Sequence, residues 1–243
     1  MIQRIGFTVL ILLMAVSYSN AQQIISDSEM ENIRHLKKDW ANLEKFRGEN
    51  LKAGIPADGE KRVVFMGNSI TIGWIEHRPE FFKGKPYINR GISGQTTPQM
   101  LVRFRQDVVD LKPAVVVILA GINDIAGNTG PSSLKMIEDN LASMCEIASA
   151  NNIKVVLSSV LPAWDFPWNP GTFPAERIRD LNQWIEQYAS SNGHTYLDYY
   201  SSMADDKGGL KSGLCYDGVH PDAAGYSVME PLLEQALKRA LGN

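Results

Sequence analysis

Short apolar runs alternate with longer stretches of helical periodicity along most of this chain. The apolar runs are rich in Val and Ile and predict strands at 63–66, 87–89, 114–119, 154–160 and 195–198. Between them, apolar residues recur every three or four positions and predict helices at 98–111, 132–150 and 175–191, with a last helix after Pro221. Strands that alternate with helices form a mostly parallel sheet with helices on both faces. The pattern therefore predicts an α/β fold, a three-layer α/β/α sandwich around a five-stranded sheet.

A further helix is predicted before the first strand, at about 28–47. Its apolar residues follow one face at steps of three and four residues, and they are Met30, Ile33, Leu36, Trp40 and Leu43. Such a stripe is typical of an amphipathic helix that packs onto a domain. We therefore expect this stripe to be part of the core rather than a cofactor site.

The first 21 residues have the pattern of a signal peptide. Arg4 precedes an apolar segment at 5–16, and the small residues Ser19 and Ala21 stand where a signal peptidase prefers them. The apolar segment is too short to span a bilayer, although an uncleaved membrane anchor is the alternative. The absence of a nearby Cys argues against a lipid-modified N-terminus. We expect residues 22–243 to be exported as a single periplasmic or secreted domain without stable membrane insertion.

The composition is that of an ordinary globular domain. Of its 243 residues, 44% are hydrophobic and 21% are charged, which is enough to build one full core. Lys and Arg number 24 against 27 Asp and Glu, and the net charge of −3 does not favour contact with phosphate backbones. Nucleic acid is therefore not expected as a partner, while the oligomeric state is left open.

The two cysteines, Cys145 and Cys215, are far apart in the sequence. An oxidising compartment would allow a bridge between them. Cys145 nevertheless falls in a helical pattern, where a buried thiol behaves as a small apolar residue, and we favour the unpaired state. Neither the cysteines nor the four histidines have the spacing of metal ligands, so no metal site is predicted.

Polar loops follow the predicted strands, and parallel strands bring such loops to one edge of the sheet. They contain the segments GNSITIG from Gly67, GISGQTT from Gly91, GIND from Gly121 and DGVH from Asp217. Ester chemistry needs a hydroxyl nucleophile, a base, a group that orients the base, and donors for an oxyanion. These loops contain residues of all four kinds.

Each candidate residue also has an ordinary explanation. Ser69 supplies a hydroxyl, but a Ser in such a turn can also cap a helix. His220 is the candidate base because Asp217 lies three residues before it, although the pair could form a surface turn. Gly94 lets a backbone N–H approach a substrate and Asn123 carries a neutral amide donor, yet they could be a turn residue and a helix cap. Because four ordinary explanations would have to hold at once, the catalytic interpretation is favoured.

These segments resemble the conserved blocks of the SGNH hydrolases, also called the GDSL lipase/acylhydrolase family, in the same order. Within that family, the sequence most resembles the branch that includes the platelet-activating-factor acetylhydrolase catalytic subunits. The resemblance implies the flavodoxin-like SGNH hydrolase fold and no metal or cofactor. It also implies that Ser69 is the nucleophile and that Asp217 and His220 complete a triad. The backbone N–H groups of Ser69 and Gly94 and the amide of Asn123 would form the oxyanion hole.

The chain departs from the family pattern at two positions. Asn68 stands where the family usually has Asp, and Gln95 stands where many members have Asp. Neither position carries the proton transfer, so activity is expected to survive. Both changes remove a negative charge near the site, and a change in the pH optimum is expected from this. Asp124, next to Asn123, is interpreted as a carboxylate that organises the loop rather than as a catalyst.

The loop after the fourth strand, at 161–174, is rich in aromatic residues and Pro. Trp164, Phe166 and Trp168 are predicted to bind substrate, since aromatic faces suit sugar rings or a hydrophobic leaving group, although they could equally pack the loop onto the sheet. Without an extended apolar lid, the resemblance favours a short acyl group on a larger alcohol, such as an acetylated carbohydrate. The alternatives are a lysophospholipase, an acyltransferase with the same site, or a non-catalytic carbohydrate-binding domain.

Overall fold

The computed structural model describes residues 26–242 of the chain. The signal peptide predicted at 1–21 lies outside these residues. Within the described part, no helix has both the length and the apolar character needed to cross a bilayer.

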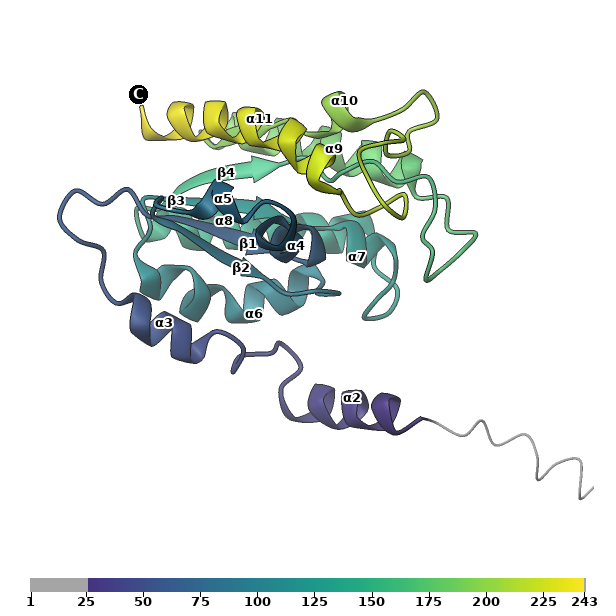
Figure 1. The fold of residues 1–243 in the computed structure, drawn as a ribbon, viewed down its shortest axis with the longest axis horizontal. Helices are drawn as coiled ribbons and strands as arrows, with labels where there is room; N and C mark the ends of the chain where they lie inside the picture. Colours follow the sequence, from purple (N-terminus) through teal and green to yellow (C-terminus); the bar gives the residue numbers. More distant parts are fainter. Residues whose placement is uncertain (1–25, 243) are drawn as a thin grey trace, which may run out of the picture. The chain divides into compact units, whose positions relative to one another are not determined.

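A five-stranded parallel sheet forms the centre of the fold (Figure 1). Its strands are β1 (Val63–Gly67), β2 (Tyr87–Gly91), β3 (Val115–Leu119), β4 (Lys154–Ser158) and β5 (Thr195–Leu197). They lie in the order β2-β1-β3-β4-β5, and each neighbouring pair is parallel. The strand order reverses next to β1, which is where open α/β sheets bind ligands. All five predicted strands are confirmed, although β4 ends two residues earlier than predicted, at Ser158.

Helices cover both faces of the sheet. The longer ones are α4 (Ser69–His77), α6 (Thr97–Asp107), α8 (Leu134–Ala150), α9 (Ala175–Ser191) and α11 (Ala223–Leu241). The helices α4 and α11 contact each other on one face, while α6, α8 and α9 form a continuous layer on the other (Figure 1). Four short helical turns complete the connections: α5 (Pro79–Phe82), η1 (Val109–Leu111), α7 (Ile122–Ile125) and α10 (Tyr200–Met203). The predicted three-layer α/β/α sandwich is confirmed.

Local sequence explains where these helices begin. Thr96 and Gln99 form a capping box at the start of α6, and the Ser133 side chain accepts the Met136 N–H at the start of α8. The Asp222 side chain accepts the N–H groups of Ala224 and Gly225 at the start of α11. The first N–H groups of a helix have no acceptor within the helix, and these cap residues accept them. Each helix therefore begins directly after its cap residue.

Two glycines allow the close packing that positions the loops at the sheet edge. A Cβ on Gly91 would lie 2.3 Å from the Ile72 nitrogen, so only glycine lets α4 approach β2 this closely. A Cβ on Gly225 would lie 2.2 Å from the Leu214 carbonyl oxygen. The first contact fixes the helix that begins at Ser69, and the second holds the loop that contains His220 against α11.

The N-terminal segment differs from its prediction. The helix α2 spans Asp27–Lys38, turns follow it, and a second helix, α3, spans Arg47–Ala53. The predicted helix at about 28–47 is interrupted because Asn42 has a left-handed backbone, with φ of 56°, which helical residues do not adopt. Among the described residues, 26–40 belong to one unit and 41–242 to another. Met30 and Ile33 of α2 are exposed rather than part of a core.

Candidate active site

Three side chains that sequence reasoning singled out form a hydrogen-bonded relay. The Ser69 Oγ lies 2.8 Å from His220 Nε2, and His220 Nδ1 lies 2.7 Å from an Asp217 carboxylate oxygen. All three side chains are half-buried. A hydroxyl, an imidazole and a carboxylate in this order allow the imidazole to accept the hydroxyl proton while the carboxylate holds its ring in one orientation.

Local backbone structure presents each member of this relay. Asn68 caps α4 by accepting the Ile70 N–H at 3.0 Å, so Ser69 is the first residue of that helix. At the other end of the relay, Asp217 accepts the backbone N–H groups of Val219 at 3.0 Å and of His220 at 2.7 Å. This tight turn explains why the D-x-x-H spacing brings the carboxylate to the imidazole.

The carboxylate is held in its charged form. Burial acts to raise the pKa of the Asp217 carboxyl, but hydrogen bonds from the His220 backbone and ring and from the Val219 N–H outweigh it and hold that pKa below its usual value. Asp217 therefore remains an anion at neutral pH, as a group that stabilises an imidazolium must.

The loops that contain Gly94 and Asn123 are joined by side-chain amides. Asn123 is buried, and its Nδ2 donates to the Gln95 carbonyl at 2.9 Å, which orients an amide that carries a second N–H. Gly94 is exposed and has a φ of 76°, and its carbonyl accepts the Asn128 amide at 3.2 Å. The carbonyls of two consecutive residues, Gly94 and Gln95, are thus each held by a side-chain amide, from Asn128 and Asn123. This arrangement can hold two donors ready for a negatively charged oxygen.

The loops after β1 and β2 are also bonded to each other. The Ile92 N–H donates to the Gly67 carbonyl at 3.1 Å, directly before Asn68 and Ser69. Both polar atoms of the Gln95 side chain have partners. Its oxygen accepts from Arg103 Nε at 2.5 Å, and its amide donates to the Ala41 carbonyl at 2.8 Å. The change in pH optimum expected from Asn68 and Gln95 stays a prediction.

Asp124 organises the loop, as predicted. Its carboxylate accepts both the backbone N–H and the hydroxyl of Thr97 and so connects the loop after β3 with the start of α6. Burial raises the pKa of Asp124 to about 6, although the bonds from Thr97 lower it. The carboxylate is 1% exposed and fully engaged, so it is positioned as a structural group.

The aromatic loop divides into residues that face solvent and one that does not. Trp168 is exposed and lies beside His220, with ring centroids 5.8 Å apart. Trp164 is also exposed, but its ring packs against Phe173. Phe166 is only 1% exposed, so its predicted substrate contact is wrong for this structure. It stacks behind Trp168 at 5.2 Å because the loop folds back onto the core at this point.

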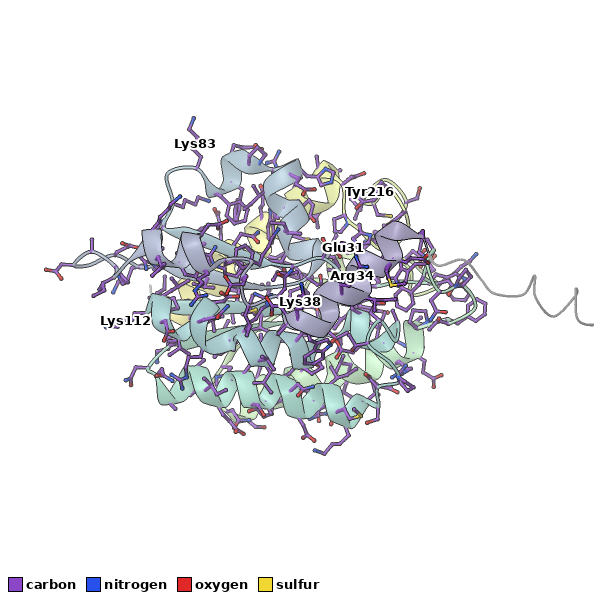
Figure 2. The ribbon with its side chains drawn as sticks, turned by 90° about the horizontal axis from the view of Figure 1, so that it is seen from below. Glu31, Arg34, Lys38, Lys83, Lys112 and Tyr216 are labelled. Carbon is purple, nitrogen blue, oxygen red and sulfur yellow. The ribbon has the colours of Figure 1, made fainter. Side chains whose placement is uncertain are left out.

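Sequence reasoning missed a second aromatic residue at the site. Tyr216 precedes Asp217, is 63% exposed, and stacks on the His220 ring with centroids 5.7 Å apart. Figure 2 shows it on the loop that leads into α11. Its position directly before the DGVH segment was the available signal.

The two cysteines are not members of this relay. Cys145 and Cys215 are both free thiols, and burial raises the pKa of Cys145 to about 12, which makes that thiol unreactive. Among residues 26–242, no group of three or more His, Cys, Asp and Glu side chains is arranged to hold a metal ion.

The family model for the GDSL-like lipase/acylhydrolase family matches residues 65–228. This range contains all the residues of the relay. The chain belongs to this family. As a GDSL acylhydrolase it is a carboxylic ester hydrolase, and the resemblance noted from the four sequence segments is confirmed.

Two solved structures are similar over nearly their whole length. A proposed acylhydrolase of Bacteroides fragilis NCTC 9343 is 49% identical with a TM-score of 0.82, and the match covers 84% of this chain and 99% of that one. A GDSL-like lipase of Bacteroides thetaiotaomicron VPI-5482 is 49% identical with a TM-score of 0.81, covering 83% and 99%. These similarities support both the fold and the family.

Curated relatives are more distant. Esterase TesA of Pseudomonas aeruginosa is 26% identical over 170 residues, 68% of this GDSL acylhydrolase and 78% of TesA. The uncharacterized lipoprotein YqeF of Bacillus subtilis is 31% identical over 129 residues, 46% of this chain, and the chain thus spans only about half (53%) of YqeF. An acetylxylan esterase of Geobacillus stearothermophilus shares the fold, at 21% identity and a TM-score of 0.55, with 76% of this chain and 94% of that one covered.

We expect Asn123→Ala to lower kcat by about a hundredfold or more and to change KM little, because an oxyanion donor acts mainly in the transition state. Steady-state kinetics with p-nitrophenyl acetate measure both constants. Asn151→Ala is the matched control, since its amide also donates to a main-chain carbonyl but lies before β4, at the opposite end of the strands. A raised KM with kcat intact would instead make Asn123 a ligand of the substrate.

Proposed function

We propose that this GDSL acylhydrolase is a serine esterase that hydrolyses esters with a short acyl group, and that acetylated carbohydrate is its substrate class. The observation that carries the proposal is the relay from Ser69 Oγ through His220 to Asp217, with both hydrogen bonds under 3 Å. Such geometry is what proton transfer from a serine hydroxyl requires.

In the proposed mechanism, His220 Nε2 takes the Ser69 proton as Oγ bonds to the ester carbonyl carbon. The carbonyl oxygen becomes an oxyanion that accepts hydrogen bonds from the N–H groups of Ser69 and Gly94 and from the Asn123 amide. Ser69 starts α4, so its N–H has no acceptor within the helix and is available. Asp217 stabilises the imidazolium.

The intermediate then collapses. The bond from the carbonyl carbon to the alcohol oxygen breaks, and His220 gives its proton to that oxygen, which leaves an acyl group on Ser69. A water molecule next loses a proton to His220 and attacks the acyl carbon. The Ser69–acyl bond breaks, Ser69 recovers its proton, and the carboxylic acid leaves.

Two observations support an acetylated carbohydrate as the substrate. Exposed aromatic rings, Trp168 and Tyr216, lie beside His220, which protonates the leaving alcohol, and such rings suit a sugar. The fold is also that of the Geobacillus acetylxylan esterase, at an identity that supports the fold alone.

The acyl preference is tested with p-nitrophenyl esters from acetate to palmitate. We expect kcat/KM to be highest at two to four carbons and to fall steeply beyond about eight, because a small acyl pocket excludes longer chains. Ser69→Ala in every assay gives the background rate. A maximum at the long chains would point to a lysophospholipase instead.

We also propose that the protein is exported, with cleavage after a signal peptide at 1–21, so that residues 22–243 act in the periplasm or outside the cell on a small-molecule ester. The support is the basic, apolar and small-residue pattern of the first 21 residues. The similarity to a Bacillus subtilis lipoprotein agrees with export. Mass spectrometry of the mature N-terminus measures the cleavage site.

A further inference from the structure

Two exposed aromatic rings flank the His220 imidazole. Tyr216 stacks on it almost in parallel, with an interplanar angle of 10° and centroids 5.7 Å apart. Trp168 approaches it at an angle of 43° and 5.8 Å. Tyr216 comes from the loop before α11 and Trp168 from the loop between β4 and α9, so the fold brings them together at one point. Their side chains are 63% and 43% exposed.

Both rings are held in place from behind. Trp168 stacks on the buried ring of Phe166 at 5.2 Å, and its indole N–H donates to the Asn128 Oδ1 at 3.1 Å. The Tyr216 ring also contacts the half-buried His77, with centroids 5.9 Å apart. Anchored rings that keep much of their apolar surface exposed offer contact area to a ligand with little loss of side-chain entropy.

The position of these rings identifies the part of the substrate that they contact. The acyl oxygen must point to Gly94 and Asn123, whereas the alcohol oxygen must lie against His220, which returns the proton to it. Groups that surround the imidazole therefore surround the alcohol. Since Trp168 and Tyr216 are the exposed rings in contact with His220, they select the leaving alcohol and not the acyl group.

The chemistry of the rim favours a sugar as that alcohol. Flat aromatic faces match the C–H faces of a pyranose ring, while its hydroxyls need nearby polar groups. The hydroxyl of the exposed Tyr216 is one such group, and Asn128, which accepts the Trp168 indole N–H and donates to the Gly94 carbonyl, is a polar neighbour of the second ring.

We propose that Trp168 and Tyr216 form a subsite that binds the pyranose ring of the leaving alcohol. This proposal rests on the esterase function above and adds the residues that recognise the alcohol.

The test compares two substrates that share the acetyl group. The alcohol of ethyl acetate is too small to reach the rings, whereas β-D-xylose tetraacetate carries a pyranose. Both substrates release acetic acid on hydrolysis, and a pH-stat measures its rate of release. For Trp168→Ala and Tyr216→Ala, we expect kcat/KM on the sugar ester to fall about tenfold or more, mainly through KM. On ethyl acetate we expect a change of less than about threefold, which also shows that the variants are folded.

Conservative and control variants sharpen the result. Tyr216→Phe and Trp168→Phe keep an aromatic face and should retain most of the preference for the sugar ester. Phe173→Ala is the matched control, because Phe173 is exposed on the same loop as Trp168 while its ring contacts Trp164. It should leave both substrates unaffected.

Three outcomes would overturn the subsite. An equal loss on both substrates would mean that the rings only position His220, and unchanged values on both would mean that they bind nothing. If the wild-type enzyme hydrolyses ethyl acetate but has no preference for the sugar ester, the proposed pyranose-binding subsite is wrong while the proposed esterase activity stands. Failure of the esterase itself is distinct, since wild type would then release acid from ethyl acetate no faster than Ser69→Ala.

Discussion

Ser69→Ala should lower kcat/KM for p-nitrophenyl acetate by a factor of about a thousand or more while the protein stays folded. The substitution removes the oxygen that bonds to the acyl carbon and that lies 2.8 Å from His220 Nε2. Because the Asp217 contact to the other ring nitrogen does not involve Ser69, the imidazole should keep its orientation. The residual rate then measures what the oxyanion donors and binding achieve without a nucleophile.

The matched control is Ser227→Ala, which removes an exposed hydroxyl on α11 that donates to the Ala223 carbonyl at 2.8 Å. It should keep wild-type kinetics. Thermal unfolding of both variants establishes that loss of activity is not loss of fold. Hydrolysis by Ser69→Ala at the wild-type rate would show that Ser69 is not the nucleophile and that the relay is not catalytic.

The sequence predicted the residues whose positions follow from strand ends. Ser69, Gly94 and Asn123 were predicted because parallel strands must bring their carboxyl ends to one edge, whatever the details of packing. His220 lies further on, in the loop between α10 and α11, and was predicted from the DGVH segment. The same segment identified Asp217 through its spacing from His220. Strand topology, the D-x-x-H spacing and the family resemblance together predicted this part of the site.

Residues that depend on contacts between loops could not be found in this way. Asn128 joins the Gly94 carbonyl to the Trp168 indole, and neither partner is near it in the sequence. Phe166 and Trp168 are two positions apart in one Pro-rich loop, yet one is buried and the other exposed. Without a regular period, the loop has no pattern that separates its two faces. The same limit applies to the turn at Asn42 that interrupts the predicted helix at about 28–47.

Arg103 is another residue that the sequence did not reveal. It is fully buried in the middle of α6, and its guanidinium contacts the ends of strands β1 and β2, which lead into the loops of the site. It donates to the Gly67 carbonyl at 3.1 Å, to the Arg90 carbonyl at 2.8 Å and to the Gln95 side chain, and it pairs with Asp107 at 3.0 Å. Burial lowers its pKa to about 10, partly offset by Asp107, so the side chain stays charged at neutral pH.

Arg103→Met should lower the free energy of unfolding by about 3–5 kcal/mol, which makes it the largest expected effect on stability. Met has a similar length and keeps the apolar contacts of the side chain, but it leaves the Asp107 carboxylate buried without its charged partner. It also removes the guanidinium bonds to the carbonyls of Gly67, which keeps the Ile92 N–H, and of Arg90. Urea unfolding followed by circular dichroism measures the change. The control is Lys135→Met, which breaks an i,i+4 pair with Asp139 on α8 whose side chains are 72% and 61% exposed, and which should cost less than about 1 kcal/mol.

A second variant separates the cost of the unpaired Asp107 charge from the cost of the lost contacts to the Gly67 and Arg90 carbonyls. Arg103→Met combined with Asp107→Leu removes both charges, so it should be more stable than Arg103→Met alone, even though Asn50 then loses its contact to the carboxylate at 2.7 Å. If Arg103→Met costs no more than Lys135→Met, the buried pair does not stabilise the fold. If the double variant is as unstable as the single one, the carbonyl contacts at the ends of β1 and β2 are the main contribution, and Arg103 then acts chiefly by holding the two loops that precede Ser69 and Gly94 together.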